Sequence, residues 1–401
     1  MSLTKRLFLF AGAALCLGGP ALAQSTADQS RAYAAETLAD AAGRTSSLAQ
    51  PGGNFTVNVH GYEQFRYNWN HRDDNALPKE NTIGFQNART RVNLSGNVGN
   101  ENWGYFVQFG TGDPEDGNLF LEDAYGTYKM EGGWTIKFGQ FKLPILREEL
   151  VGDTFQLFAD RSVLNSVFTQ GRSQGIQFSY EADAFRFFGA FSDGIQTANT
   201  DFDSASEADW ALTARLDWKW AGNWKQANDF TSFQNSDYFG MVGGALHWQS
   251  GGDTGAGAFG TTADVDALEG TVDASIEGNG WNAYAAGIFR HVDPAGGTKL
   301  DDWGFLIQGG IFVAPQWEII GSYDIVIPDS DNASNDNFST IRVGVNHYFL
   351  PESHAAKLTI DLSWFLDKQD SSIVPASTLT GLLASDNDSQ FNLRGQIQLM
   401  F

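Results

Sequence analysis

The sequence predicts an all-β protein: a transmembrane antiparallel β-barrel of about 16 strands with an inward-folded third outer loop. Three observations predict it: alternating segments from Phe55 onward, connections that alternate between short and long, and aromatic residues that follow the short connections. Strand side chains point alternately to opposite faces. The last segment, 389–401, has one apolar face that ends on Phe401 and one polar face that includes Arg394.

The composition favours strands over membrane-spanning helices. The chain has 45 Gly but only 10 Pro, with 31 Phe, 12 Trp and 11 Tyr. Beyond the N-terminus it has no apolar run of about 18 to 20 residues, the length that a membrane-spanning helix needs. A membrane role therefore requires a barrel.

The N-terminus has the layout of a secretory signal peptide. Residues 1–23 combine Lys5 and Arg6 with an apolar run and a small-residue end, and we place cleavage before Gln24. Residues 24–53 form an Ala-rich periplasmic segment that is able to form a short helix. It is either a loosely ordered tail or a helix that packs in a trimer or plugs the pore. The barrel is expected over 54–401.

Charge and cysteine content exclude several functions. The formal net charge is -23, and an acidic chain repels phosphate, so nucleic acid is not an expected partner. The single cysteine, Cys16, lies in the signal, which excludes disulfides from the mature chain. The six histidines have no close pair with metal-ligand spacing, so no metal or other cofactor is expected.

The connections alternate in length as they do in bacterial barrels, which have short periplasmic turns and long outer loops. The short connections are 99–102, 131–133, 182–184, 277–280, 313–316 and 350–355, and the long ones include 71–82, 192–209, 250–263, 328–337 and 368–388. Residues 221–237 are long where a short turn is expected. Either two short strands lie there, giving 18, or the periplasmic side carries an insertion.

Aromatic residues mark the inner edge of the membrane, because such side chains settle between hydrocarbon and water. The predicted inner girdle consists of Trp103, Trp134, Phe185, Trp281 and Trp317. Phe401, the terminal aromatic, is the expected assembly signal for the barrel-assembly machinery.

The third outer connection, 139–173, is unusually apolar for a solvated loop. Folding inward would bury its apolar side chains and narrow the pore, whereas the alternative is packing on a neighbouring subunit or the rim. If it folds inward, the residues at the constriction are Lys142, Arg147, Glu148, Glu149, Asp153, Asp160 and Arg161.

Strand faces opposite the apolar ones carry more bases than acids. The expected lumen-facing bases are Arg66, Arg89, Arg91, Lys137, Arg186, Arg215, Arg290, Arg342 and Arg394, with Lys219 and Lys357. Rings of charge select ions in pores. Either these bases favour anions or they pair with acids and only hydrate the wall.

Three stretches resemble the phosphate-selective porin O/P family: FGQFKLP (138–144) followed by Glu148, Glu149 and Leu150, DAYGTYK (123–129), and ARTRVNLSG (88–96). The resemblance extends over about residues 55–190. It implies a 16-stranded trimeric porin with inward-folded loops, and phosphate-specific members line the pore with arginines and lysines. None of those pore residues can be aligned individually here.

The sequence thus predicts a bacterial outer-membrane porin, without enzymatic activity, for passive diffusion of small hydrophilic solutes and ions. Its expected partners are outer-membrane lipid, two further copies of the chain, the barrel-assembly machinery, and small anions or other solutes. One alternative is a general or cation-favouring pore. More remote alternatives are a barrel hydrolase and a surface adhesin.

Overall fold

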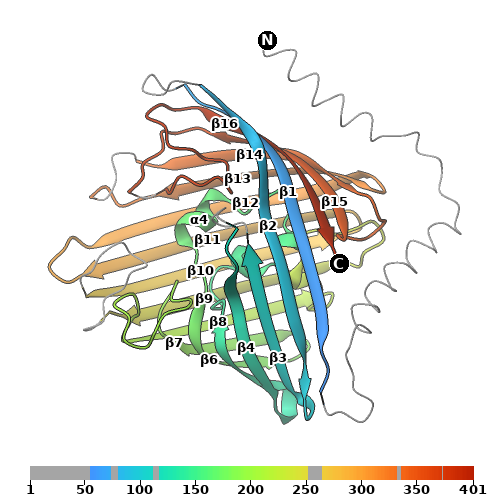
Figure 1. Cartoon of the computed structure of the whole chain (residues 1–401), viewed down its shortest axis with the longest axis vertical. Coiled ribbons are helices and arrows are strands. Elements are labelled where there is room, and N and C mark those ends of the chain that lie inside the picture. Colours follow the sequence, from blue (N-terminus) through green and yellow to red (C-terminus); the bar gives the residue numbers. More distant parts are fainter. Residues whose placement is uncertain (1–54, 74–79, 112–116, 252–263, 332–335, 373) are drawn as a thin grey trace, which may run out of the picture.

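The computed structural model describes residues 55–73, 80–111, 117–251, 264–331, 336–372 and 374–401. The expected signal peptide and segment 24–53 lie outside these ranges. Sixteen antiparallel strands form a closed barrel, as predicted (Figure 1). The strands are β1 (Asn58–His71), β2 (Asn81–Val98), β3 (Asn100–Thr111), β4 (Phe120–Lys129), β5 (Trp134–Phe141), β6 (Ser173–Glu181), β7 (Phe185–Ser192), β8 (Trp210–Ala221), β9 (Phe239–Ser250), β10 (Val265–Gly278), β11 (Trp281–Pro294), β12 (Leu300–Ala314), β13 (Trp317–Ile327), β14 (Phe338–Tyr348), β15 (Ala356–Phe365) and β16 (Gln390–Met400).

The last strand closes the barrel by pairing with the first. β16 runs antiparallel to β1 from Tyr62 opposite Met400 to His71 opposite Phe391. Phe401 continues this ladder, because its N–H donates to the Gly61 carbonyl at 2.9 Å and its carbonyl accepts from Gly61 at 2.7 Å. Its ring is exposed on the outer surface. Closure leaves no free sheet edge.

The connections follow the predicted alternation. At one end the strands are joined by short segments, such as 182–184, 279–280 and 315–316. Residues 222–238, between β8 and β9, contain only the 3-10 turn η3 (Gln226–Asn228) and no strand. The insertion alternative is therefore correct, and the strand count is 16.

Inward and outward faces alternate along each strand. On β16 the outward face carries Phe391, Leu393, Ile397 and Leu399, while Arg394 and its polar neighbours are buried inside. The predicted girdle residues stand at or near the starts of their strands at the short-turn end, all exposed except the half-buried Trp317: they are Trp103, Trp134, Phe185, Trp281 and Trp317.

The remaining ordered elements are short. Between β5 and β6 lie α3 (Arg147–Leu150), η2 (Asp153–Phe155) and α4 (Val163–Phe168), and η1 (Glu131–Gly133) joins β4 to β5. No helix in the described part of the chain is long and apolar enough to cross a membrane.

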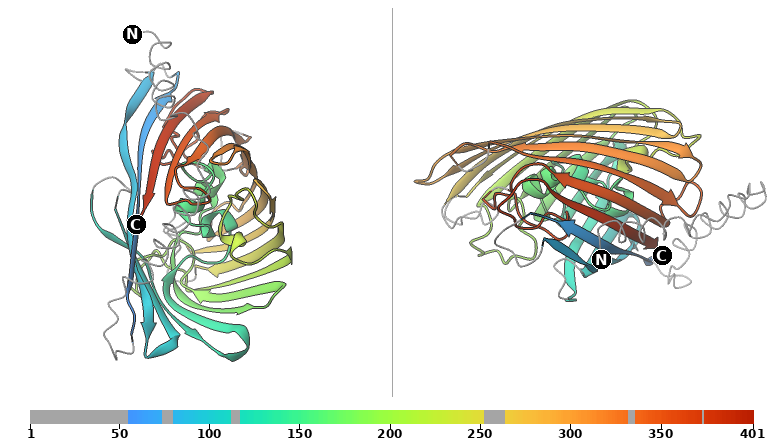
Figure 2. Two further views of the ribbon diagram at one scale, coloured as in Figure 1. Left: turned by 90° about the vertical axis from the view of Figure 1, so that its right-hand side faces the viewer. Right: turned by 90° about the horizontal axis from the view of Figure 1, so that it is seen from above.

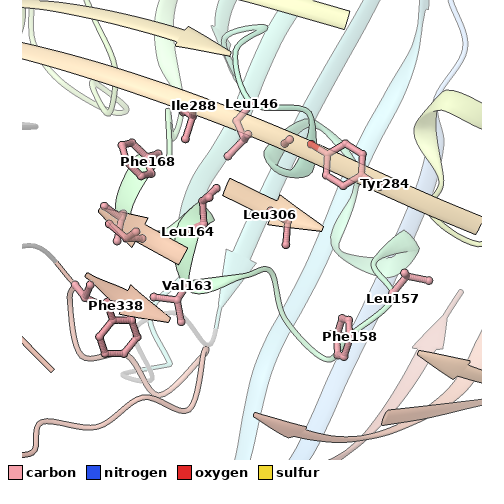
Figure 3. Packing of buried hydrophobic residues seen from close by; sticks show 14 of the residues in the cluster. Leu146, Leu157, Phe158, Val163, Leu164, Phe168, Tyr284, Ile288, Leu306 and Phe338 are labelled. Carbon is pink, nitrogen blue, oxygen red and sulfur yellow. The ribbon is translucent and has the colours of Figure 1, made fainter. Parts of the chain in front are cut away.

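The main hydrophobic cluster lies between α4 and the inward faces of β11 to β15. Leu164 and Phe168 of α4 share it with Ile288, Leu306 and other inward side chains of these strands (Figure 3). The views in Figure 2 place the green segment that holds α4 between the wall of β1 to β3 and the wall of β10 to β15. One side of the barrel interior is therefore packed like a protein core.

Gly304 on β12 lies directly against side chains of α4. A Cβ there would lie 2.8 Å from Leu164 Cδ1, 2.8 Å from the Phe168 ring and 3.0 Å from Ile288. We expect Gly304→Val to overpack this contact and destabilise the protein by about 1–3 kcal/mol. The measurement is the temperature at which the purified protein loses its compact mobility on a denaturing gel. Gly321→Ala, where nothing lies within 4 Å of the added carbon, should leave that temperature unchanged.

Candidate pore constriction

Residues 142–172, the connection between β5 and β6, have a locally fixed shape. Glu148 of α3 accepts hydrogen bonds from the Ser162 backbone N–H at 2.8 Å and from its hydroxyl at 2.6 Å. Ser162 is also the N-cap of α4 and accepts from the Asn165 N–H at 3.0 Å. One buried carboxylate thus ties α3 to α4.

Basic side chains of the barrel wall donate hydrogen bonds to the backbone carbonyls of this connection. Buried carbonyls need partners, and this irregular segment has no strand ladder to supply them. The bonds run from Arg66 to Ala159 (3.1 Å), Arg215 to Ile145 (2.9 Å), Arg290 to Val167 (2.9 Å), Arg342 to Asp160 (2.9 Å) and Lys357 to Gln156 (2.9 Å). The donors come from five strands, β1, β8, β11, β14 and β15, so the segment is held from several sides.

A cavity of about 420 Å³ lies beside the connection, between it, the wall and the last outer loop. It is lined by Arg89 and Arg91 of β2, by Glu122 of β4, by Lys142, Glu149, Asp153, Asp160, Arg161, Ser162, Asn165, Ser166, Thr169 and Arg172 of the connection, and by Pro375, Ala376, Ser377, Leu379 and Thr380 of the last loop. Charged groups and hydroxyls dominate this lining.

The charges form a continuous ladder that begins and ends on a base. In order, the side chains are Arg66, Asp160, Arg89, Asp153, Arg161, Glu149 and Lys142, with successive ion-pair distances of 3.3, 2.8, 3.6, 2.5, 3.8 and 2.9 Å. Every base has an acidic neighbour, but the ladder contains one more base than acids. Its net charge is therefore weakly positive.

A second cluster extends the charged surface on the β2 and β4 side. Glu122 joins Arg91 at 2.7 Å to Arg172 at 2.8 Å, and Arg172 also binds Asp123 at 3.0 Å. Two bases are here matched by two acids. The cluster adds polarity without adding net charge.

The acids of the charge ladder are strongly held in the ionised form. Burial alone would raise the pKa of Glu149, but the charges of Lys142 and Arg161 outweigh it and lower that pKa to about 2. Burial is likewise outweighed at Asp153, where Arg161 and Arg89 lower the pKa well below its usual range. The ladder therefore keeps its acids ionised at ordinary pH.

Five of the seven residues predicted for the constriction line this cavity, and two do not. Lys142, Glu149, Asp153, Asp160 and Arg161 line it. Glu148 is fully buried beneath α4. Arg147 points toward the β8 to β9 connection and donates to the Ala227 carbonyl at 2.9 Å.

The predicted lumen-facing bases all lie on inward faces, but only Arg89 and Arg91 line the cavity. Arg66, Arg215, Arg290 and Arg342 support the connection, as described above. Arg394 is paired with Asp361 at 2.7 Å and donates to Leu379 and Thr380 carbonyls of the last outer loop at 2.9 and 3.1 Å. Arg186 pairs with Asp217 at 3.0 Å, and Lys137 lies over the rings of Tyr125 and Phe141.

The sequence did not predict several of the residues that line the cavity. Glu122 and Arg172 lie near strand ends and belong to no recognisable motif. Residues 375–380 belong to a polar loop, whose composition predicts exposure to solvent. The sequence did contain a signal for the inward packing of residues 142–172, because inward positions on β11 and β13, such as Ile288 and Ile320, are apolar. Apolar inward positions in a barrel indicate that something packs inside. Among the described residues, no three His, Cys, Asp or Glu side chains are grouped to hold a metal ion.

Comparison with known proteins agrees with this architecture. The family model of phosphate-selective porin O and P matches residues 58–243. None of the curated proteins matches the sequence significantly.

Similar solved structures are outer-membrane proteins at low sequence identity, and they support the fold. The anion-selective porin from Comamonas acidovorans is 13% identical with a TM-score of 0.62, covering 86% of this chain and 100% of that one. The channel DcaP of Acinetobacter baumannii is 13% identical with a TM-score of 0.58 (87% and 99% covered). OmpT of Vibrio cholerae in its trimer form is 15% identical with a TM-score of 0.57 (86% and 99% covered).

The family match covers β2, β4 and residues 142–172, which line most of the cavity, but not the last outer loop. The fold is a closed sixteen-stranded barrel. The resemblance found in the sequence is thereby confirmed, and the protein is an outer-membrane porin similar to the phosphate-selective porin O and P family.

Proposed function

We propose that small hydrophilic solutes and ions diffuse passively past the cavity beside residues 142–172, with a weak preference for anions. The observation that carries this proposal is the charge ladder, which starts at Arg66 and ends at Lys142. Residues 142–172 fold inward and set the diameter of the channel. The charge ladder sets the electrostatic field that a passing ion experiences. The protein catalyses no reaction.

The anion preference is weak for two reasons. Each base on the ladder shares its field with an acid less than 4 Å away, and most other inward bases are engaged by backbone carbonyls. The anion-selective neighbour from Comamonas acidovorans and the name of the matching family favour the same sign. A cation-favouring pore, made so by acidic outer loops, is the rival.

We further propose that the chain is exported with cleavage of residues 1–23, is inserted through its C-terminal strand by the assembly machinery, and forms a homotrimer in lipid. One residue supports a protein partner on the outer face of β1. Tyr62 and Gln64 hydrogen-bond inward to Asp153, so Glu63 between them points outward. A carboxylate that faces lipid is unfavourable, whereas a subunit interface can accommodate one.

Lys142→Met should reduce the anion preference by removing the base at the end of the ladder. A unit charge about 10 Å from a permeating ion in water contributes about 0.4 kcal/mol, with opposite sign for chloride and for potassium, so the chloride to potassium permeability ratio should fall roughly fourfold. The measurement is the reversal potential in planar bilayers under a salt gradient. Lys299→Met removes the same charge from an exposed outer position and should change the ratio little. A wild-type ratio that already favours potassium contradicts the proposed preference.

Glu149→Gln should raise the chloride to potassium ratio, and the difference from wild type should depend on pH in a defined way. Because the folded pKa of Glu149 is about 2, below the ordinary value of about 4.3, the wild-type carboxylate stays charged as the pH falls from 7 to 4. The difference should persist over that window and fall to about half near pH 2. Its disappearance already at pH 4 would show that the ladder does not hold this charge.

The variant Glu63→Leu tests whether position 63 faces lipid or a subunit interface. At an interface the change removes a polar contact, so we expect less trimer on a mild-detergent gel, with the monomer still heat-modifiable. If β1 faces lipid at this point, the same variant should form at least as much oligomer as the wild type.

A further inference from the structure

The connection between β8 and β9, residues 222–238, breaks the rule that turns at its end of the barrel are short. We propose that it is a brace: it holds the constriction segment 142–172 from the short-turn end and closes the mouth beneath β9 to β15. This inference rests on the proposed channel function.

The connection reaches across the mouth of the barrel. Near β10 and β11, Ser232 Oγ donates to the Gly278 carbonyl at 2.6 Å. Further across, Thr231 Oγ1 lies 3.1 Å from the Tyr348 hydroxyl at the end of β14. Asp229 lies 2.8 Å from His354 Nε2, in the turn that leads into β15. The segment thus leaves β8 and is fastened at β10, β14 and β15.

The same connection is joined directly to the constriction segment. Arg147 donates from Nε and one terminal nitrogen to the Ala227 carbonyl, at 3.2 and 2.9 Å. Its guanidinium lies 5.1 Å from the centre of the Phe230 ring, and cation–π contacts of this kind stabilise desolvated arginines. The Phe230 N–H donates to the Phe155 carbonyl at 3.3 Å.

Phe230 also seals the space between the two segments. Its ring is 3% exposed and belongs to the cluster formed by α4 and the wall, with the Tyr284 ring 4.7 Å away. An apolar, closely packed region holds no continuous water path. The proposed ion path therefore leaves the charged cavity on the side away from β9 to β15.

The brace explains why Arg147 does not line the cavity although it lies on the same segment as Lys142. The wall arginines fix the connection from the sides, and Arg147 fixes it from below. A constriction held in this way keeps one diameter, so the open channel should carry a steady current.

The test compares four variants in single-channel recordings. Replacing 223–237 by a short Asn-Gly turn removes the brace, and conductance should rise roughly twofold because flux follows the open cross-section. Phe230→Ala removes only the seal and should at least double the noise of the open current, while Phe230→Leu should restore a quiet current. Phe202→Ala, at an outer-loop ring that is 94% exposed, is the matched control and should behave as wild type.

Heat-dependent gel mobility first establishes which variants form barrels. If the turn replacement does not form a barrel, the comparison of current noise between Phe230→Ala and Phe230→Leu tests the brace. Folded variants whose conductance and current noise equal those of the wild type overturn the brace while leaving the channel intact. A wild-type protein that conducts nothing overturns the proposed function instead, so the two failures are distinguishable.

Discussion

The interior of this barrel depends on one kind of interaction, the hydrogen bond from a basic wall side chain to a backbone carbonyl of residues 142–172. An irregular segment inside a barrel has no neighbouring strand, so each buried carbonyl without a donor would cost about 1–3 kcal/mol. Arg215 on β8 and Arg342 on β14 supply such donors from two separate parts of the wall. The position of the segment, and with it the shape of the cavity, follows from these bonds.

In the proposed channel, the same bonds limit how much these bases contribute to ion selectivity. A guanidinium that binds a carbonyl and a carboxylate at once, as Arg394 does, offers little free charge to a passing ion. The excess of inward bases therefore does not translate into an anion-attracting field of the same size. The field comes mainly from the few charges that line the cavity, where bases exceed acids only slightly.

Much of the fold was predictable because it is encoded locally. The alternation of apolar and polar residues, the lengths of the turns and the positions of Trp residues predicted the strands and a strand count of 16 or 18. They also predicted that residues such as Arg89 and Arg394 face inward. The partners of inward residues were not predictable, because they are set by contacts distant in sequence. Arg147 looked like a constriction residue, and only the fold reveals that Ala227, far along the chain, is its acceptor. Residues 221–237 left two alternatives open for the same reason.

Sixteen strands leave a wide aqueous lumen unless something fills it. The inward faces of the strands differ in polarity. β11 to β13 present apolar side chains such as Ile288, Leu306 and Ile320. β16 and β1 present polar ones such as Gln398 and Arg66. The apolar faces pack against α4 and exclude water, whereas the polar side chains of β16 and β1 donate hydrogen bonds to backbone carbonyls of residues 142–172. The polarity of the barrel wall thus decides which part of residues 142–172 packs as a core and which part is held by hydrogen bonds.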